Sequence, residues 1–223
     1  MKFGVIVFPG SNCDRDMIEA LEIHLKQEVI QLWHKDKDLS AFTREDCIVL
    51  PGGFSYGDYL RCGAIARFSP MMQSVIQFAQ NGGKVLGVCN GFQILCESGL
   101  LPGVLLRNNK QQFVCKNVFI RAGHNEAATP LKIPVAHGEG RFYADEATMQ
   151  SLEANQQIIY RYCDENGALS DAANPNGATN HIAGISNAQR NVFGMMPHPE
   201  RACSLSGLGN ADGIQVFHDL FGI

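Results

Sequence analysis

The chain has 223 residues, of which 45% are hydrophobic and 18% are charged, and its formal net charge is −4. This hydrophobic fraction excludes an intrinsically disordered chain, and the small negative charge argues against a nucleic-acid-binding protein, which needs a basic surface. No apolar run approaches the roughly 18 residues that a membrane-spanning helix requires. The apolar run Phe3–Phe8 stops at Pro9-Gly10 and is too short for a secretion signal. We therefore expect a cytoplasmic protein with no membrane or nucleic-acid partner.

The eight cysteines are scattered along the chain, and none belongs to a Cys-x-x-Cys pair. Zinc ribbons and dithiol redox motifs need that pair, so the sequence predicts neither. Disulfides are not expected in a cytoplasmic chain. Five histidines show no metal-ligand spacing, namely His24, His34, His124, His181 and His218. The sequence therefore predicts no metal site.

The first half of the chain alternates apolar runs with patterns of helical period. Buried strands are predicted over Lys2–Phe8, Glu28–Trp33, Asp46–Leu50 and Lys84–Val88. Three helices are predicted between and after them: one capped by Asp14 or Asp16, one over 68–79, and one over Asn90–Glu97. This alternation is typical of an α/β protein with a doubly wound, mostly parallel sheet and flanking helices.

The second half is richer in strands. These are predicted over Phe113–Ile120, Ile158–Tyr162, Ile182–Ser186 and Val192–Met196. A closing helix is predicted over Asp212–Phe221, and residues 164–180 are predicted to form a hairpin or loop because they are rich in Asn, Gly, Ala and Asp. No repeat or linker interrupts the pattern, so one domain over residues 1–223 is expected.

The strongest chemical signal is Gly87-Val88-Cys89-Asn90-Gly91, which lies between a predicted strand and a predicted helix. Glycines two residues before and after a nucleophile permit the sharp turn of a nucleophile elbow. The start of the following helix favours a thiolate at Cys89, and the amide of Asn90 is placed to hold an oxyanion. The alternative is a buried cysteine in a glycine-rich turn, which this motif alone does not exclude.

A nucleophilic cysteine needs a base, and the base needs an orienting group. The segment Pro197-His198-Pro199-Glu200 offers both, directly after an apolar strand. The prolines favour an extended backbone, in which residues i and i+2 face the same side. We therefore expect Glu200 to hold one imidazole nitrogen of His198 while the other faces Cys89. Without the cysteine elbow, the same segment would be read as a loop with a surface ion pair.

A glycine-rich loop, Pro51-Gly52-Gly53-Phe54-Ser55-Tyr56-Gly57-Asp58, follows the third predicted strand. Its Gly-Gly pair allows the amide of Gly53 to approach a ligand as a second oxyanion donor. Gly52 and Gly57 have the spacing of a phosphate-binding loop, but Asp58 stands where that loop has lysine. The sequence therefore predicts no nucleotide site.

Two other cysteines are alternative candidates for the nucleophile, and one further histidine is a candidate for ligand binding. Cys62 lacks the preceding glycine and strand that surround Cys89, and Cys13 fits an elbow less well still. His137 lies in the glycine-flanked segment Ala136–Arg141, which is read either as a loop beside a polar ligand or partner, or as a solvated turn.

Taken together, these segments resemble the class I, triad-type glutamine amidotransferases. The resemblance covers nearly the whole chain and rests on FPGSNCD (Phe8–Asp14), PGGFSYGDYLRCGAIA (Pro51–Ala66), GVCNGFQIL (Gly87–Leu95), LLRN (Leu105–Asn108), FVC (Phe113–Cys115), AHGEGR (Ala136–Arg141) and MPHPER (Met196–Arg201). The Pro51–Ala66 motif is the most specific of these, and it is similar to that of the glutaminase subunits of de novo purine synthesis. The resemblance implies a flavodoxin-like fold in a single type 1 glutamine amidotransferase domain.

The resemblance also implies a role for each matched residue. Cys89 would attack the side-chain amide of L-glutamine and form a thioester, while His198, oriented by Glu200, transfers the protons. The oxyanion would be held by the main-chain amides of Gly53 and Asn90. Glutamine-pocket residues would be Gln93, His137 and Gly138.

The partners implied by the resemblance lie outside this chain. Ammonia would pass to a large synthetase subunit, which uses ATP and Mg²⁺ to convert formylglycinamide ribonucleotide into formylglycinamidine ribonucleotide. A third small subunit would complete the enzyme, and this chain would need no cofactor of its own. One segment, Arg121–Pro134, is shorter than the family usually has.

Three alternatives stay open on the sequence. The chain could be a class I glutaminase that serves another acceptor enzyme. It could be a DJ-1/PfpI-like cysteine hydrolase or sensor, although that class lacks the late His-x-Glu motif and Gln93. It could also be a non-catalytic interaction module, against which the intact Cys89, His198 and Glu200 argue.

Overall fold

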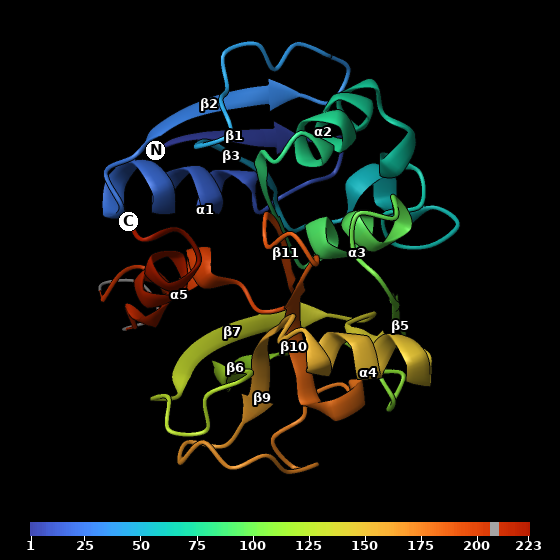
Figure 1. Ribbon diagram of the computed structural model, residues 1–223, viewed down its shortest axis with the longest axis vertical. Coiled ribbons are helices and arrows are strands. Elements are labelled where there is room, and N and C mark those ends of the chain that lie inside the picture. The colour runs from blue at the N-terminus through green and yellow to red at the C-terminus, as the bar shows by residue number, and fades with distance from the viewer. Residues whose placement is uncertain (206–209) are drawn as a thin grey trace.

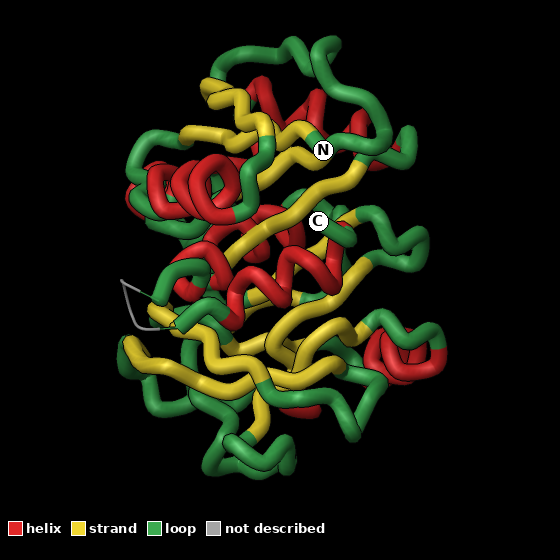
Figure 2. The backbone as a smooth tube through the Cα atoms, turned by 90° about the vertical axis from the view of Figure 1, so that its left-hand side faces the viewer, coloured by secondary structure: helices red, strands yellow, loops and turns green. Residues whose placement is uncertain are grey.

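The computed structural model describes residues 1–205 and 210–223 of the chain. A nine-stranded sheet runs through the molecule in the order β2-β1-β3-β4-β11-β10-β9-β6-β7. Its strands follow one another along the long axis, and the two chain ends lie near each other (Figures 1 and 2). The bounds of the strands are β1 Lys2–Val7, β2 Glu28–Trp33, β3 Cys47–Leu50, β4 Lys84–Val88, β6 Val114–Ala122, β7 Leu131–His137, β9 Ile158–Cys163, β10 Ile182–Ser186 and β11 Val192–Met195.

The upper half of the sheet is parallel and confirms the doubly wound prediction. Strands β2, β1, β3, β4 and β11 pair in parallel, and helices connect or follow them. These helices are α1 Asp14–Glu19 with its π-helical continuation Ala20–His24, α2 Pro70–Gln80 and α3 Asn90–Glu97. In an open parallel sheet of this kind, the carboxyl ends of the strands share one edge, where ligands bind.

The lower half is antiparallel and extends the sheet beyond β11 (Figure 1). A separate two-stranded sheet pairs β5 Val104–Leu106 with β8 Arg141–Tyr143. Helix α4 Glu146–Ala154 follows β8, and helix α5 Asp212–Phe221 closes the chain and packs on β7. Buried side chains form one continuous hydrophobic cluster that includes residues of both halves, such as Val5, Leu86 and Tyr162.

Several sequence-based expectations need correction. Neither Asp14 nor Asp16 caps α1, because the N-cap residue is Cys13 and the two aspartates lie in the first turn. Helix α2 begins at Pro70, two residues later than the apolar pattern suggested, with the Ser69 hydroxyl as its cap. Of the two forms predicted for residues 164–180, the structure has the loop, with a short 3-10 helix from Thr179.

The segment Arg121–Pro134 consists of the end of β6, the turn after it and the start of β7. The turn requires glycine at position 123, because a Cβ there would lie 2.1 Å from the carbonyl oxygen of Ile158. The Gly123 amide donates to the Ile159 carbonyl at 2.9 Å, which holds this hairpin against β9.

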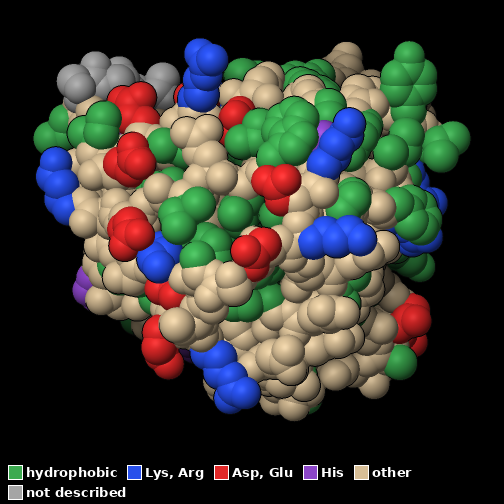
Figure 3. All heavy atoms as spheres, turned by 90° about the horizontal axis from the view of Figure 1, so that it is seen from above, with side chains coloured by type: hydrophobic (Ala, Val, Ile, Leu, Met, Phe, Trp, Pro, Cys, Tyr) green, Lys and Arg blue, Asp and Glu red, His purple; other side chains and the backbone are tan. Residues whose placement is uncertain are grey.

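No helix among the described residues is long and apolar enough to cross a membrane. Seen from above, the surface intersperses Lys and Arg side chains with Asp and Glu side chains (Figure 3). This mixture agrees with the small net charge of −4.

Candidate active site

Cys89 occupies a strained turn between β4 and α3. Its φ of 50° and ψ of −104° are rarely adopted by a residue with a side chain. The flanking glycines make the turn possible because the helix start packs directly on the sheet. A Cβ on Gly91 would lie 1.9 Å from the Leu50 carbonyl oxygen, and one on Gly87 would lie 2.6 Å from the Gly91 carbonyl. This is the geometry of a nucleophile elbow.

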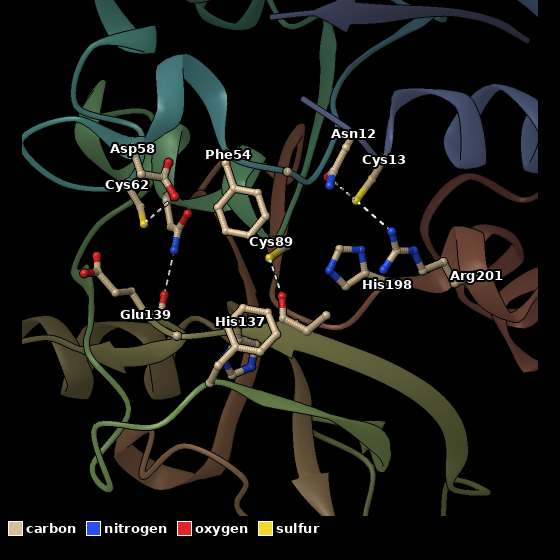
Figure 4. Close-up of a pocket in the computed structure, with 15 residues that line it drawn as sticks. Asn12, Cys13, Phe54, Asp58, Cys62, Cys89, His137, Glu139, His198 and Arg201 are labelled. Carbon is tan, nitrogen blue, oxygen red and sulfur yellow. Dashed lines mark hydrogen bonds between the residues drawn. The ribbon is translucent and has the colours of Figure 1, made fainter. Parts of the chain in front are cut away.

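The segment that carries His198 lies beside the elbow because β11 pairs with β4. Val88 and Met195 are partners in this parallel ladder, and the Cys89 amide donates to the Met195 carbonyl at 2.8 Å. The His198 amide donates in turn to the Pro134 carbonyl of β7 at 2.8 Å. As a result, the side chains of Cys89 and His198 face each other across a pocket (Figure 4).

Glu200 binds the imidazole of His198 as expected, but the backbone conformation of the segment differs from the one predicted. The two side chains meet at 2.7 Å between Nδ1 and Oε1, and both are buried, with 1% and 5% of their surfaces exposed. The expected extended segment is wrong, because Pro199–Ala202 forms a 3-10 turn. This turn folds the carboxylate back onto the imidazole, and a proline at its first position is well suited to start it.

The electrostatics of His198 favour its protonated form. Burial by itself lowers the pKa of His198, but the Glu200 carboxylate and the Cys89 thiol outweigh it and hold the pKa well above its ordinary value. Among the described residues, Nε2 of His198 has no hydrogen-bond partner. That nitrogen is therefore available for proton transfer.

The two residues expected to donate main-chain amides to the oxyanion, Gly53 and Asn90, lie in the loop after β3 and at the start of α3, directly after Cys89. Gly53 lines the pocket with a φ of 132°, and a Cβ there would lie 2.6 Å from the Asn12 nitrogen. Asn90 is the first residue of α3, so its N–H has no acceptor inside the helix. The Asn90 side chain ties the two segments together, because its Oδ1 accepts from the Ser55 amide at 3.1 Å.

The three residues expected in the glutamine pocket, Gln93, His137 and Gly138, all line it. Gln93 is held by protein contacts at both ends of its amide: Nε2 donates to the Glu139 carbonyl at 2.6 Å, and Oε1 accepts from Asn90 at 2.9 Å. Gly138 lies beside the aromatic ring of Phe113.

His137 is a buried, neutral member of the pocket wall. Its Nδ1 meets Asn108 Oδ1 at 3.2 Å and its Nε2 meets the Asn176 amide nitrogen at 3.5 Å. Burial, with a smaller effect of the His198 charge, lowers the pKa of His137 to about 4. These contacts favour a role in holding the wall of the pocket over proton transfer.

Cys62, the rival nucleophile, also lines the pocket, but its thiol is held in its protonated form. Its Sγ donates to Asp58 Oδ2 at 3.0 Å. Burial raises the pKa of Cys62, and the Asp58 and Glu139 carboxylates raise it further. A thiol with a raised pKa is a poor nucleophile near neutral pH, which favours Cys89.

Sequence reasoning did not place Cys13, Asp58, Glu139 or Arg201 in the site, although all four line the pocket. Cys13 Sγ accepts a hydrogen bond from Arg201 Nη2 at 3.2 Å, while Arg201 Nε donates to Asp16 at 2.8 Å. Each of these four residues belongs to a motif that carried the family resemblance, and that membership was the available signal.

One group of side chains among the described residues has the composition of a metal site. Ligand atoms of Cys13, His198 and Glu200 lie within 4.8 Å of one another. The guanidinium of Arg201, which donates to Cys13, places a positive charge beside the group and disfavours a cation there. The arrangement therefore fits acid-base chemistry better than metal binding.

Comparison with known proteins agrees with this chemistry. Residues 1–209 match the model of a family described as a CobB/CobQ-like glutamine amidotransferase domain. A relative from Moorella thermoacetica, phosphoribosylformylglycinamidine synthase subunit PurQ, is 57% identical, over 97% of this chain and 93% of its own length. A protein of the same name from Gloeobacter violaceus is 51% identical, over 99% of this chain and 97% of its own length.

Among solved structures, a chain of PurLQS from Thermotoga maritima superposes with a TM-score of 0.82 at 38% identity. The match covers 99% of this chain and 97% of that one. The similarity therefore extends over both the parallel and the antiparallel halves of the sheet.

Proposed function

Because the chain belongs to the CobB/CobQ-like glutamine amidotransferase family, we propose that it is the glutaminase subunit of a phosphoribosylformylglycinamidine synthase. It hydrolyses L-glutamine to glutamate and ammonia, and the ammonia converts formylglycinamide ribonucleotide into formylglycinamidine ribonucleotide in purine biosynthesis. The observation that carries the chemistry is the elbow of Cys89 facing the buried His198–Glu200 pair. The names of the relatives are the observation that supports formylglycinamide ribonucleotide as the acceptor.

The first half of the reaction makes the thioester. Cys89 Sγ attacks the amide carbon of the glutamine side chain as a thiolate, because its proton already lies on Nε2 of His198, whose protonated form is favoured. The carbonyl oxygen gains the negative charge, which the amides of Gly53 and Asn90 stabilise. When the intermediate collapses, the carbon–nitrogen bond breaks, and the proton on His198 passes to the leaving nitrogen to give ammonia.

The second half releases glutamate. His198 takes a proton from water, whose oxygen attacks the thioester carbon and forms a second oxyanion. The carbon–sulfur bond then breaks, which restores the Cys89 thiolate beside the protonated His198. Throughout the cycle, Glu200 keeps the imidazole oriented and stabilises its charged form, as the carboxylate of a Ser-His-Asp triad does.

We place the acceptor chemistry on partner subunits. The large synthetase subunit would bind ATP and Mg²⁺, and a third small subunit would complete the enzyme. The PurQ relatives and the PurLQS match support such an assembly. Residues 1–223 act as one glutamine amidotransferase domain that needs no cofactor of its own, and we place the enzyme in the cytoplasm.

The relatives favour this function over the alternatives drawn from the sequence. Matches at 51–57% identity over nearly the full length carry one name, which disfavours another acceptor enzyme and a DJ-1/PfpI-like sensor. The buried ion pair beside a strained nucleophile disfavours a non-catalytic module, because such strain persists where function requires it.

The test is release of glutamate and ammonia from L-glutamine by the assembled complex, supplied with ATP, Mg²⁺ and formylglycinamide ribonucleotide. Cys89→Ser abolishes the release, whereas Cys62→Ala retains it. Release that rises when the synthetase subunits are added supports both the chemistry and the acceptor. If Cys89→Ser still releases glutamate, the assigned nucleophile is wrong. If adding the synthetase subunits does not change the rate of glutamate release, the assigned acceptor is wrong.

A further inference from the structure

The pocket has two chemically different ends on either side of Cys89. One side carries His198, Cys13 and Arg201, and the other carries Asp58, Cys62 and Glu139 (Figure 4). The first side contains the proton-transfer group. The second side is acidic and takes no part in the mechanism above.

Two hydrogen bonds hold the Asp58 carboxylate in this acidic side of the pocket. Its Oδ1 accepts from Asn90 Nδ2 at 3.1 Å, and its Oδ2 accepts from Cys62 Sγ at 3.0 Å. The loop reaches this position through left-handed backbone at three consecutive residues, with φ of 54° at Tyr56, 68° at Gly57 and 53° at Asp58. Two of these carry side chains, and strain of this kind accumulates at ligand-binding sites.

No described cation forms an ion pair with Asp58. Arg201, which lines the pocket, pairs with Asp16 at 2.8 Å, and two further arginines are also paired: Arg61 with Glu97 at 2.7 Å and Arg107 with Glu139 at 3.5 Å. Asp58 forms no ion pair with any described residue, and burial, together with the nearby Glu139, raises its pKa. A half-buried carboxylate that has hydrogen bonds but no cation beside it is stabilised by a ligand that brings a positive charge.

We propose that Asp58 binds the α-ammonium group of glutamine and so selects the free amino acid. This inference rests on the proposed glutaminase function, which fixes the amide carbon of the substrate at Cys89. With His198 on one side of Cys89, the remainder of the substrate extends towards Asp58 and Gln93. The ammonium group is the only positive charge that glutamine carries, and Asp58 is the carboxylate in the pocket that lacks a cation.

The test separates charge recognition from loop shape. We would compare L-glutamine with glutaramate, which has hydrogen in place of the α-ammonium group, and measure ammonia release by the complex. Asp58→Asn keeps the size of the side chain and one acceptor oxygen for Asn90, while its NH2 group can donate to the Cys62 sulfur in place of the bond that Cys62 donates to Asp58. Asp171→Asn, which removes one negative charge at an exposed position outside the pocket, is the matched control.

In the wild-type complex, we expect kcat/KM for glutamine to exceed that for glutaramate by about 10- to 100-fold, the range for a hydrogen bond between charged groups. Asp58→Asn reduces this ratio to near unity by raising KM for glutamine, with kcat at saturation retained. Asp171→Asn leaves the ratio unchanged.

Two results would overturn the inference while leaving the glutaminase function intact. In one, Asp58→Asn lowers kcat/KM for glutamine and for glutaramate by the same factor, which would mean that Asp58 only shapes the loop. In the other, the ratio in Asp58→Asn equals that of the wild type. A wild-type complex that releases no ammonia from glutamine would instead overturn the proposed function, and the inference would fall with it.

Discussion

Gly52 is the residue whose replacement tests the geometry of the triad most directly. A Cβ at Gly52 would lie 2.7 Å from Cε1 of His198 and 3.2 Å from Sγ of Cys13. The φ of Gly52 is outside the left-handed region, so alanine adopts this backbone without strain. Ordinary contact begins near 3.4 Å, so the imidazole must move by about 0.7 Å. Its Nδ1 is tied to Glu200 at 2.7 Å, and the movement therefore misaligns Nε2 with Cys89.

We expect Gly52→Ala to lower kcat for glutamine hydrolysis by about 10- to 100-fold, because a misplacement near 1 Å costs up to ~100-fold in a positioned reaction. KM changes little, since Gly52 does not line the pocket. Overpacking also lowers the free energy of unfolding by about 1–3 kcal/mol. Both quantities are measured on the same preparation, by ammonia release from the complex and by urea unfolding of the chain.

The control is Gly99→Ala, which has open space around the added methyl group but a φ of 73°. It destabilises the chain through backbone strain but retains kcat, whereas Gly52→Ala lowers both the stability and kcat. If Gly52→Ala kept both the wild-type kcat and the wild-type stability, the imidazole would not be confined between Gly52 and Glu200, and the reasoning would be refuted.

Two further predictions concern pH. Glu200→Gln removes the carboxylate that raises the pKa of His198, so that pKa falls, and loss of one partner of the buried pair costs about 3–5 kcal/mol of stability. Because a raised histidine pKa stabilises the fold below its unfolded value of 6.5, the stability difference between wild type and variant is largest at acidic pH and shrinks as pH rises through the folded pKa. Urea unfolding across this range measures it, and a difference that grew with pH would contradict the assignment. For His137, the unfolded chain takes up a proton near 6.5 and the folded chain only near 4, so acidification between these values destabilises the protein by about 3 kcal/mol through this residue alone. His137→Asn removes that share of the pH dependence, and an unchanged slope would show that His137 is already protonated in the fold.

The apolar strands of both halves could be predicted from the sequence, including β6, β9, β10 and β11 of the second half, whereas β5, β7, β8 and α4 could not. β5 and β8 have three residues each, too few to show a period. Helix α4 buries only Met149 and Leu152, so its apolar stripe is weak. Its cap was a usable signal, because Asp145 accepts from the Thr148 amide at 2.8 Å.

Strand β7 was missed because Pro134 interrupts its pattern. Proline removes a main-chain donor and is confined to edge strands, and β7 is the last strand of the sheet. At this edge, the Pro134 carbonyl accepts from the His198 amide. The residue that hid the strand from sequence reasoning therefore also helps to position the catalytic segment.

The site divides in the same way. Cys89, His198 and Glu200 lie in two short motifs, each of which follows a predicted strand. These motifs were enough to predict that the three side chains meet. Asp58 was noticed only as a residue that excludes a phosphate loop, since no spacing rule shows that a left-handed stretch turns its carboxylate into the pocket. Cys13 was set aside as a nucleophile, and its contact with Arg201 depends on the packing of segments from opposite ends of the chain.

The pairing of β4 with β11 also has a consequence for biosynthesis. Cys89 emerges from the ribosome early, whereas the strand that brings its base is the last of the sheet to be synthesised and must insert between β4 and β10. Parallel pairing between distant segments is slow to form, so Cys89 is synthesised well before the active site can assemble. A stalled or truncated chain that ends before β11 therefore carries the nucleophile without its histidine, and it consumes no glutamine before a complete subunit is ready to deliver ammonia.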